Sequence, residues 1–101
     1  MYMKPNYSSF LSLKITLAND NPNRLSDIDI PFYDMNFECK TNALYYGNGT
    51  VMENLLNMGE VAYFRSGNLK DIFIKNVTAG NNGVLVLSGT VPTVFVQEAL
   101  E

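Results

Sequence analysis

Apolar and polar residues alternate along several short stretches of this chain, and a period of two predicts strands rather than helices. The clearest stretch is residues 10–17, where Leu11, Leu13, Ile15 and Leu17 are separated by polar side chains. Successive side chains of a strand point to opposite faces. The pattern therefore predicts a strand with one buried face and one solvated face.

The predicted fold is organised around residues 73–91, in which two β-rich arms flank the glycine- and asparagine-rich segment 79–83. Glycine and asparagine tolerate the positive φ angles of a hairpin turn, so the two arms are predicted to form a hairpin. Residues 84–87 are apolar at four consecutive positions. Such a run can be covered on both faces, which predicts a strand near the middle of a sheet.

Residues 27–32 and 35–39 also alternate, but the apolar positions change parity between the two stretches. A bend or β-bulge near Tyr33 and Asp34 would keep both halves facing the core. Pro31 has no N–H to donate to a neighbouring strand, so an edge strand is predicted here.

Two further strands are predicted at residues 43–46 and 60–65, each followed by turn-forming glycine and asparagine residues. Residues 51–58 form the one segment inside the domain that is typical of a helical turn, and Gly59 is expected to end it. About seven or eight short strands with almost no helix predict an all-β fold, an antiparallel β-sandwich or a small barrel.

A chain of 101 residues supports a single core. We expect the domain at residues 10–93, an N-terminal arm at 1–9 and a C-terminal tail at 94–101, both with aromatic residues. Charged residues make up 17% of the chain, below the roughly 25% of a typical soluble domain. A surface so poor in charge suits a protein that is packed against a partner.

Charge and hydropathy argue against two classes of partner. The net charge is −3 and the seven Lys and Arg residues are dispersed, whereas nucleic-acid binding needs clustered cations, so no nucleic-acid partner is expected. The longest apolar run is four residues, too short for a membrane span. The first residues lack the charged and apolar regions of a signal peptide, and none is predicted.

The residue types that carry most enzyme chemistry are scarce. The chain has no histidine and one cysteine, Cys39, so a Ser-His-Asp or Cys-His arrangement or a usual zinc site is not expected. Cys39 occupies an alternating apolar position, which predicts a small buried side chain. With ten acids, a glycosidase built on paired carboxylates stays formally open. We nevertheless expect no enzyme and no cofactor.

One loop has the spacing of a calcium site. Asn19, Asn21 and Asn23 supply alternating oxygens, but Arg24 stands at the sixth position, where glycine is needed, and Ile30 at the twelfth, where glutamate is needed. No metal site is therefore predicted in this loop.

The order of motifs between residues 37 and 91 carries a resemblance. It consists of Asn-Ala-Leu-Tyr-Tyr-Gly at 42–47, Leu-Asn-Met-Gly-Glu at 56–60, an aromatic strand, Asp-Ile-Phe-Ile at 71–74 and a glycine-rich turn into 83–86. This order resembles small β-sandwich proteins of tailed-phage structural gene modules, and most closely the auxiliary or decorating head proteins of crAss-like phages. The resemblance covers just over half of the chain.

The resemblance implies a virion protein without catalytic residues, made in the host cytoplasm and located in the capsid. It implies partners among the major capsid protein, other virion proteins and copies of the chain itself. We expect Tyr2, Tyr7 and Phe10 of the arm, and Phe95 and Leu100 of the tail, to contact such a partner. The alternative is that these side chains close the ends of the chain's own domain.

A second hypothesis is a carbohydrate-binding or fibre-associated module. Tyr45 and Tyr46 directly precede the turn at 47–49, so aromatic rings lie close to an asparagine-containing loop. In this hypothesis the two rings stack on a sugar and asparagine side chains bond to its hydroxyl groups. The alternative for both tyrosines is packing within the sheet.

Overall fold

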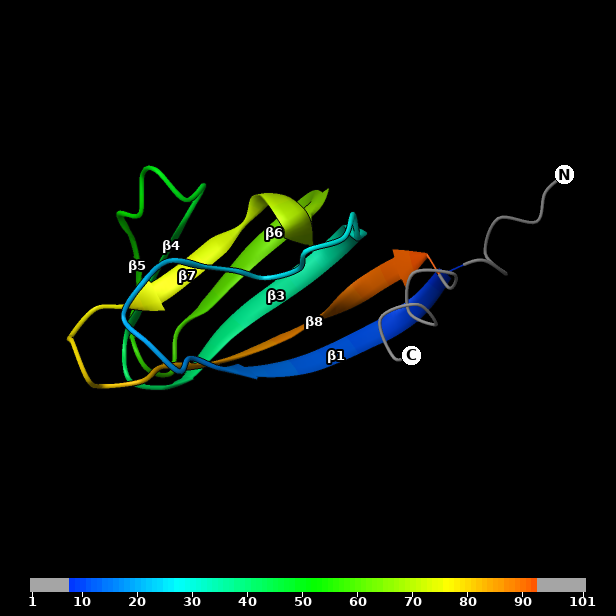
Figure 1. Ribbon diagram of the computed structural model, residues 1–101. Helices are drawn as coiled ribbons and strands as arrows, with labels where there is room; N and C mark the ends of the chain where they lie inside the picture. Colours follow the sequence, from blue (N-terminus) through cyan, green and yellow to red (C-terminus); the bar gives the residue numbers. More distant parts are fainter. Residues whose placement is uncertain (1–7, 93–101) are drawn as a thin grey trace, which may run out of the picture.

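The computed structural model describes residues 8–92 and shows an all-β sandwich of two antiparallel, four-stranded sheets (Figure 1). Sheet A contains, in spatial order, β1 (Ser8–Thr16), β8 (Val84–Pro92), β3 (Pro31–Thr41) and β6 (Val61–Asn68). Sheet B contains β2 (Asn23–Arg24), β7 (Phe73–Asn76), β4 (Leu44–Gly47) and β5 (Asn54–Leu56). The prediction of an antiparallel sandwich is confirmed.

The core lies between the two sheets and is rich in aromatic residues. Phe37 of β3 and Phe64 of β6 have ring centroids 4.6 Å apart, and the ring of Tyr46 from sheet B meets Phe64 edge-on at 5.6 Å. Phe32 contacts both phenylalanines. Alternating apolar side chains of β1, β3 and β8 complete the core, as the strand periodicity predicts.

β8 is central, as predicted, because it pairs with both β1 and β3. Its burial nevertheless alternates: Leu85 and Leu87 are fully buried, while Val84 and Val86 are only half-buried. The four-residue apolar run therefore has one core face and one outer face.

The predicted hairpin between residues 73–91 is wrong, because its two arms belong to different sheets. β7 pairs with β2 and β4 in sheet B, whereas β8 lies in sheet A. The glycine- and asparagine-rich loop crosses between the layers. Asn76, only 4% exposed, anchors this crossing because its Oδ1 accepts from the N–H of Gly83 at 2.8 Å. Both a hairpin and a crossing need such turn residues, so the turn signal alone does not distinguish them.

The bulge predicted near Tyr33 and Asp34 is confirmed. Asp34 has a φ of 51°, and the register of β3 against β8 shifts between Tyr33 and Asn36. The edge-strand prediction for Pro31 is wrong, since β3 lies between β8 and β6. Pro31 is the first residue of the strand, a position that tolerates the missing N–H.

The strand predicted at 27–32 begins only at Pro31. The Ser26 hydroxyl donates to the carbonyl of Ile28 at 2.8 Å and accepts from its N–H at 3.2 Å, which folds the preceding residues into a turn. The N–H of Ile30 then bonds to the side chain of Asn68 at 3.0 Å, so a side chain takes the place of a neighbouring strand.

The helical turn predicted at 51–58 is also wrong, because this segment contains β5. Leu56 pairs with Leu44 of β4 and is buried, and Asn54 donates to the carbonyl of Tyr46 at 2.9 Å. The one helical element among residues 8–92 is η2 (Leu69–Asp71), a single 3-10 turn between β6 and β7. Pairing with β4 therefore overrides the local helical pattern.

Cys39 is fully buried, as predicted. Its thiol donates to the carbonyl of Asn42 at 2.8 Å. Burial is the main cause that raises the pKa of this thiol. Cys39 is therefore a packing residue of the core.

Candidate functional site

Asparagine side chains of the loops bond to one another and to the loop backbone. The side-chain oxygen of Asn19 accepts from the N–H of Asn21 at 3.0 Å and from the side chain of Asn23 at 3.1 Å. Within residues 8–92 no group of three or more His, Cys, Asp or Glu side chains is arranged to hold a metal ion. These loop oxygens hold the loop together.

A polar node centred on the buried side chain of Asn76 joins the β1–β2 loop to the β7–β8 crossing. The Asn76 side-chain nitrogen lies 2.8 Å from a carboxylate oxygen of Asp20 and 3.0 Å from the side-chain oxygen of Asn82. The same Asp20 oxygen accepts from the N–H of Gly80 at 3.0 Å. These donors lower the pKa of Asp20, the Asn76 bond contributing most. The node fixes two loops at one end of the sandwich.

The outer face of sheet A carries exposed aromatic side chains in register. Phe10 of β1 pairs with Thr90 of β8, which pairs with Tyr33 of β3, so the three form one cross-strand row. Phe10 is 72% exposed and Tyr33 is 54% exposed. Their neighbours Leu11 and Phe32 are buried, which places Phe10 and Tyr33 on the face that points away from the core.

The next row contains Ser12, Ser88, Asn36 and Tyr63 and bears no charge. Tyr63 of β6 is 58% exposed. Its hydroxyl donates to Asp34, and this bond is the main cause that raises the pKa of Tyr63. We call Phe10, Tyr33 and Tyr63, together with the small polar residues between them, the aromatic face.

The third row brings charge to the same side of sheet A. It contains Lys14, Val86, Glu38 and Val61. Lys40 lies 3.4 Å from Glu38 in an exposed ion pair. The aromatic face is therefore bounded along β1 and β3 by this charged row. In the half nearer to Pro92, charge is confined to Asp34 and Arg65, which are exposed beside Tyr63.

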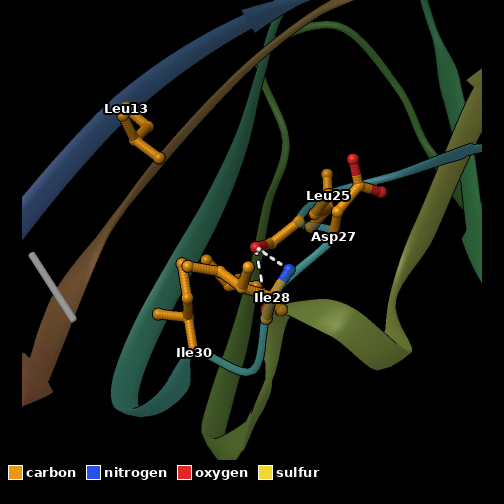
Figure 2. Close-up of a pocket in the computed structure, with 7 residues that line it drawn as sticks. Leu13, Leu25, Asp27, Ile28 and Ile30 are labelled. Atoms are coloured by element: carbon orange, nitrogen blue, oxygen red, sulfur yellow. Dashed lines mark hydrogen bonds between the residues drawn. The ribbon is translucent and has the colours of Figure 1, made fainter. Parts of the chain in front are cut away.

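A pocket opens between β1, an edge strand of sheet A, and the loop that joins β2 to β3 (Figure 2). Its volume is about 350 Å³. Five of its lining side chains are apolar, and they come from β1, from this loop and from η2: Leu13, Leu25, Ile28, Ile30 and Leu69.

The two polar residues of the pocket do not face its apolar wall. The hydroxyl of Ser26 is bonded to the backbone of Ile28, and the carboxylate of Asp27 is directed away from Leu13 and Ile30 (Figure 2). Ile28 stays 43% exposed although it is apolar. The pocket is therefore suited to an apolar group rather than to a charged substrate.

The candidate residues from the sequence are separated in the structure. Phe10 lies on the aromatic face. Tyr45 and Tyr46 point to opposite faces of sheet B: Tyr46 packs against Phe64 in the core, while the Tyr45 ring lies 6.0 Å from the Lys75 ammonium on the outer side. The pair does not form a common platform. The other four predicted residues lie outside residues 8–92: Tyr2, Tyr7, Phe95 and Leu100.

Sequence reasoning missed Tyr33 and Tyr63 as surface residues. For Tyr33 the signal was its position directly after the inward Phe32 in an alternating stretch, before the bulge at Asp34. For Tyr63 the signal was its position between half-buried Ala62 and Phe64 in an alternating strand. That these two rings join Phe10 depends on the sheet order, which no local pattern contains.

Neither a scan against protein-family models nor a search of curated proteins finds a match for this chain. Among residues 8–92 no helix is long and apolar enough to cross a membrane.

Proposed function

We propose that this chain is a non-catalytic structural protein that attaches to a larger protein assembly through the aromatic face of sheet A. The observation that carries the proposal is the cluster of three exposed rings on one outer sheet surface: Phe10, Tyr33 and Tyr63. Exposed aromatic residues are enriched at protein interfaces because they bury a large area with few rotatable bonds.

The aromatic face is preorganised for binding. Its residues stand on paired strands, with β8 and β3 in the middle of sheet A. The bond from Tyr63 to Asp34 restricts one ring before any partner arrives. Less side-chain entropy is then lost on association than for rings on loops.

We propose a tailed-phage capsid as the assembly, with the chain as an auxiliary protein that binds and stabilises the major capsid shell. This finer proposal rests on the sequence resemblance across residues 37–91. The low charge of the chain and its small, all-strand domain agree with a subunit that adds a modest interface many times over a symmetric shell.

The carbohydrate-binding alternative is weakened, because its two tyrosines lie on opposite faces of sheet B. Residues other than Tyr45 and Tyr46 could still bind a glycan, and the experiment described next distinguishes that outcome. The proposed experiment therefore includes a glycan array with the isolated chain.

The test is co-sedimentation of the purified chain with virus particles or empty heads from its natural source. We expect the wild-type chain to sediment with them and Tyr33→Asp to bind about tenfold more weakly or worse, as for a central interface residue. Met58→Asp is the matched control, because Met58 is 65% exposed but lies in the turn between β5 and β6. Equal binding by both variants would rule out the aromatic face, and glycan binding without particle binding would rule out the structural role.

A further inference from the structure

β1 forms one border of sheet A, and it is a long and regular edge strand (Figure 1). It pairs with β8 at nine consecutive positions without a shift of register, and it contains no proline. Edges of this kind are usually blunted by short strands, prolines, bulges or inward-pointing charges. The edges of sheet B, β2 and β5, have only two and three residues, and the pairing of β6 with β3 is interrupted at Asp34. β1 is therefore the edge best suited to pair with a further strand.

Backbone groups of alternate β1 residues point to the open edge. The N–H of Leu17 donates at 3.0 Å to the carbonyl of Gly83, which directly precedes β8. Because bonded and non-bonded pairs alternate in an antiparallel ladder, every second residue of β1 directs its N–H and C=O away from β8. These residues are Phe10, Ser12, Lys14 and Thr16. Within residues 8–92 β1 pairs with no strand other than β8, so no strand meets these groups there.

The inner side of the same edge is apolar. Leu13 and Ile15 pack against the core but are only half-buried, and Leu13 lines the pocket. Ile28 of the same pocket is 43% exposed. Lys14 is exposed on the outer face, so no charge of residues 10–16 points inward against an added strand. A strand with apolar residues on its inward side would therefore cover this border of the core.

β1 itself has the pattern that this edge requires. In an antiparallel pair related by a two-fold axis, residues of equal parity must lie opposite each other for the inner faces to match. With the axis at Leu13, the two copies of Leu13 meet, and Leu11 lies opposite the partner's Ile15. On the outer face Ser12 lies opposite the partner's Lys14. Apolar residues therefore meet apolar residues, and no like charges face each other.

The two neighbouring registers are less complementary. An axis at Lys14 sets two like charges directly opposite, which destabilises a cross-strand pair. An axis at Ser12 sets the apolar Ile15 opposite the partner's Ser9. The register about Leu13 avoids both faults. It also brings four pairs of outward-pointing backbone groups together, and because each such pair exchanges two bonds, about eight hydrogen bonds form.

We propose that β1 is a homodimer interface, in which the β1 strands of two copies pair antiparallel about Leu13 and join two four-stranded sheets into one continuous sheet. This inference is independent of the proposed function, because it uses only the edge and the inner face of β1. In the dimer the two aromatic faces lie on the same side of the joined sheet.

The first test measures the mass of the purified chain by sedimentation velocity over a range of protein concentrations. The wild type is expected to reach about twice the 11.3 kDa of one chain. Ser12→Pro removes an N–H that points to the open edge, a position where an edge strand tolerates proline. This variant is expected to stay monomeric with an unchanged far-ultraviolet circular dichroism spectrum.

Val61→Pro is the matched control. Val61 begins β6 at the opposite border of sheet A, and its N–H also points away from the neighbouring strand, because the bonded pair is that of Cys39 with Glu60. This control is expected to dimerise like the wild type. A wild type that is monomeric at every concentration would overturn the proposal, as would a folded Ser12→Pro that dimerises equally well.

The second test determines the register and does not depend on the folding of Ser12→Pro. Leu13→Cys sets two thiols opposite each other at a non-hydrogen-bonded pair, with Cα atoms about 4.5 Å apart, within the range of a disulfide. A disulfide-linked dimer is expected under mild oxidation. Ser12→Cys is the control, because its two copies lie diagonally, about 7–8 Å apart, and little crosslinking is expected. No crosslink of Leu13→Cys above the control, or crosslinking of Ser12→Cys in its place, would overturn the proposal.

Discussion

At the scale of single residues, Asn76 links the two layers of the sandwich. It is a buried polar side chain, and its amide bonds to both loops at one end of the fold. Its local sequence, the end of an alternating strand, suggests an ordinary solvated asparagine. Burial of an amide is tolerated only where its donors and acceptors are bonded, and here they are.

We predict that Asn76→Ala lowers the free energy of unfolding by about 1–3 kcal/mol, because the buried N–H of Gly83 loses its acceptor. Asn81→Ala is the control, since Asn81 is an exposed residue of the same loop. Urea denaturation measures both variants. Equal stability of Asn76→Ala and the wild type would show that the node does not stabilise the fold.

Asp20 makes stability depend on pH at the same node. Hydrogen bonds from Asn76 and Gly80 lower the pKa of Asp20 in the folded chain. The pKa of an aspartate in the unfolded chain is about 3.9. Because the pKa of Asp20 is lower than this in the folded chain, its carboxylate stabilises the fold above that pH, and the stabilisation is lost as pH falls through the pKa of the folded state.

We therefore predict that Asp20→Asn lowers the melting temperature near neutral pH, and that its difference from the wild type shrinks below about pH 4. Asp29→Asn, which removes an exposed carboxylate on another loop, serves as the control. Thermal melting across this pH range provides the measurement. A difference that stays constant down to the lowest pH would contradict the role assigned to the Asp20 carboxylate.

At the scale of elements, local patterns predicted strands well where one face is buried throughout. The strand at residues 10–17 and the bulge at Asp34 follow from the parity of apolar positions. The crossing between β7 and β8 could not be predicted in this way, because glycine and asparagine residues form the turns of hairpins and of crossings alike. β5 was missed because three residues are too few for a periodic signal and pairing with β4 decides its conformation.

The candidate site was less predictable than the fold. Phe10 was identified from the sequence, but its neighbours on the aromatic face come from β3 and β6, far away in the chain. Tyr45 and Tyr46 are adjacent in sequence and for that reason point to opposite faces of a strand. The pocket is formed by three separate segments and left no sequence signal.

The packing of β6 against β3 yields a prediction for Gly67. A Cβ at this position would lie 2.7 Å from the end of the Phe32 ring, which is 1% exposed. Because Phe32 is held by two other rings, Gly67→Ala is expected to cost about 1–3 kcal/mol of stability. Ser66→Ala, at an exposed neighbour, is the control in chemical denaturation. An unchanged unfolding midpoint for Gly67→Ala would show that the ring has room to move.

At the scale of the whole molecule, the area of the outer face of sheet A limits the affinity of a contact made through it. A face nine residues long and four strands wide covers roughly 550 Å², below the roughly 800 Å² that each partner contributes to a standard interface. A single contact through this face is therefore expected to be of moderate affinity.

Because the charges beside the rings, Asp34 and Arg65, are opposite in sign, attachment to particles is predicted to change little when salt is raised from low to physiological strength. Lys14→Glu, which reverses a charge in the adjoining row, is expected to bind like the wild type. Co-sedimentation across a salt series measures both. Steep loss of binding with salt would instead assign the contact to the row of sheet A that contains Lys14 and Glu38.

The most direct measurement is a cryo-electron microscopy map of particles that carry the chain. The proposed function predicts density for the sandwich on the shell, with Phe10, Tyr33 and Tyr63 against the shell subunits and sheet B turned outward. A map with sheet B against the shell, or with no density for the chain on particles incubated with an excess of it, would contradict the account.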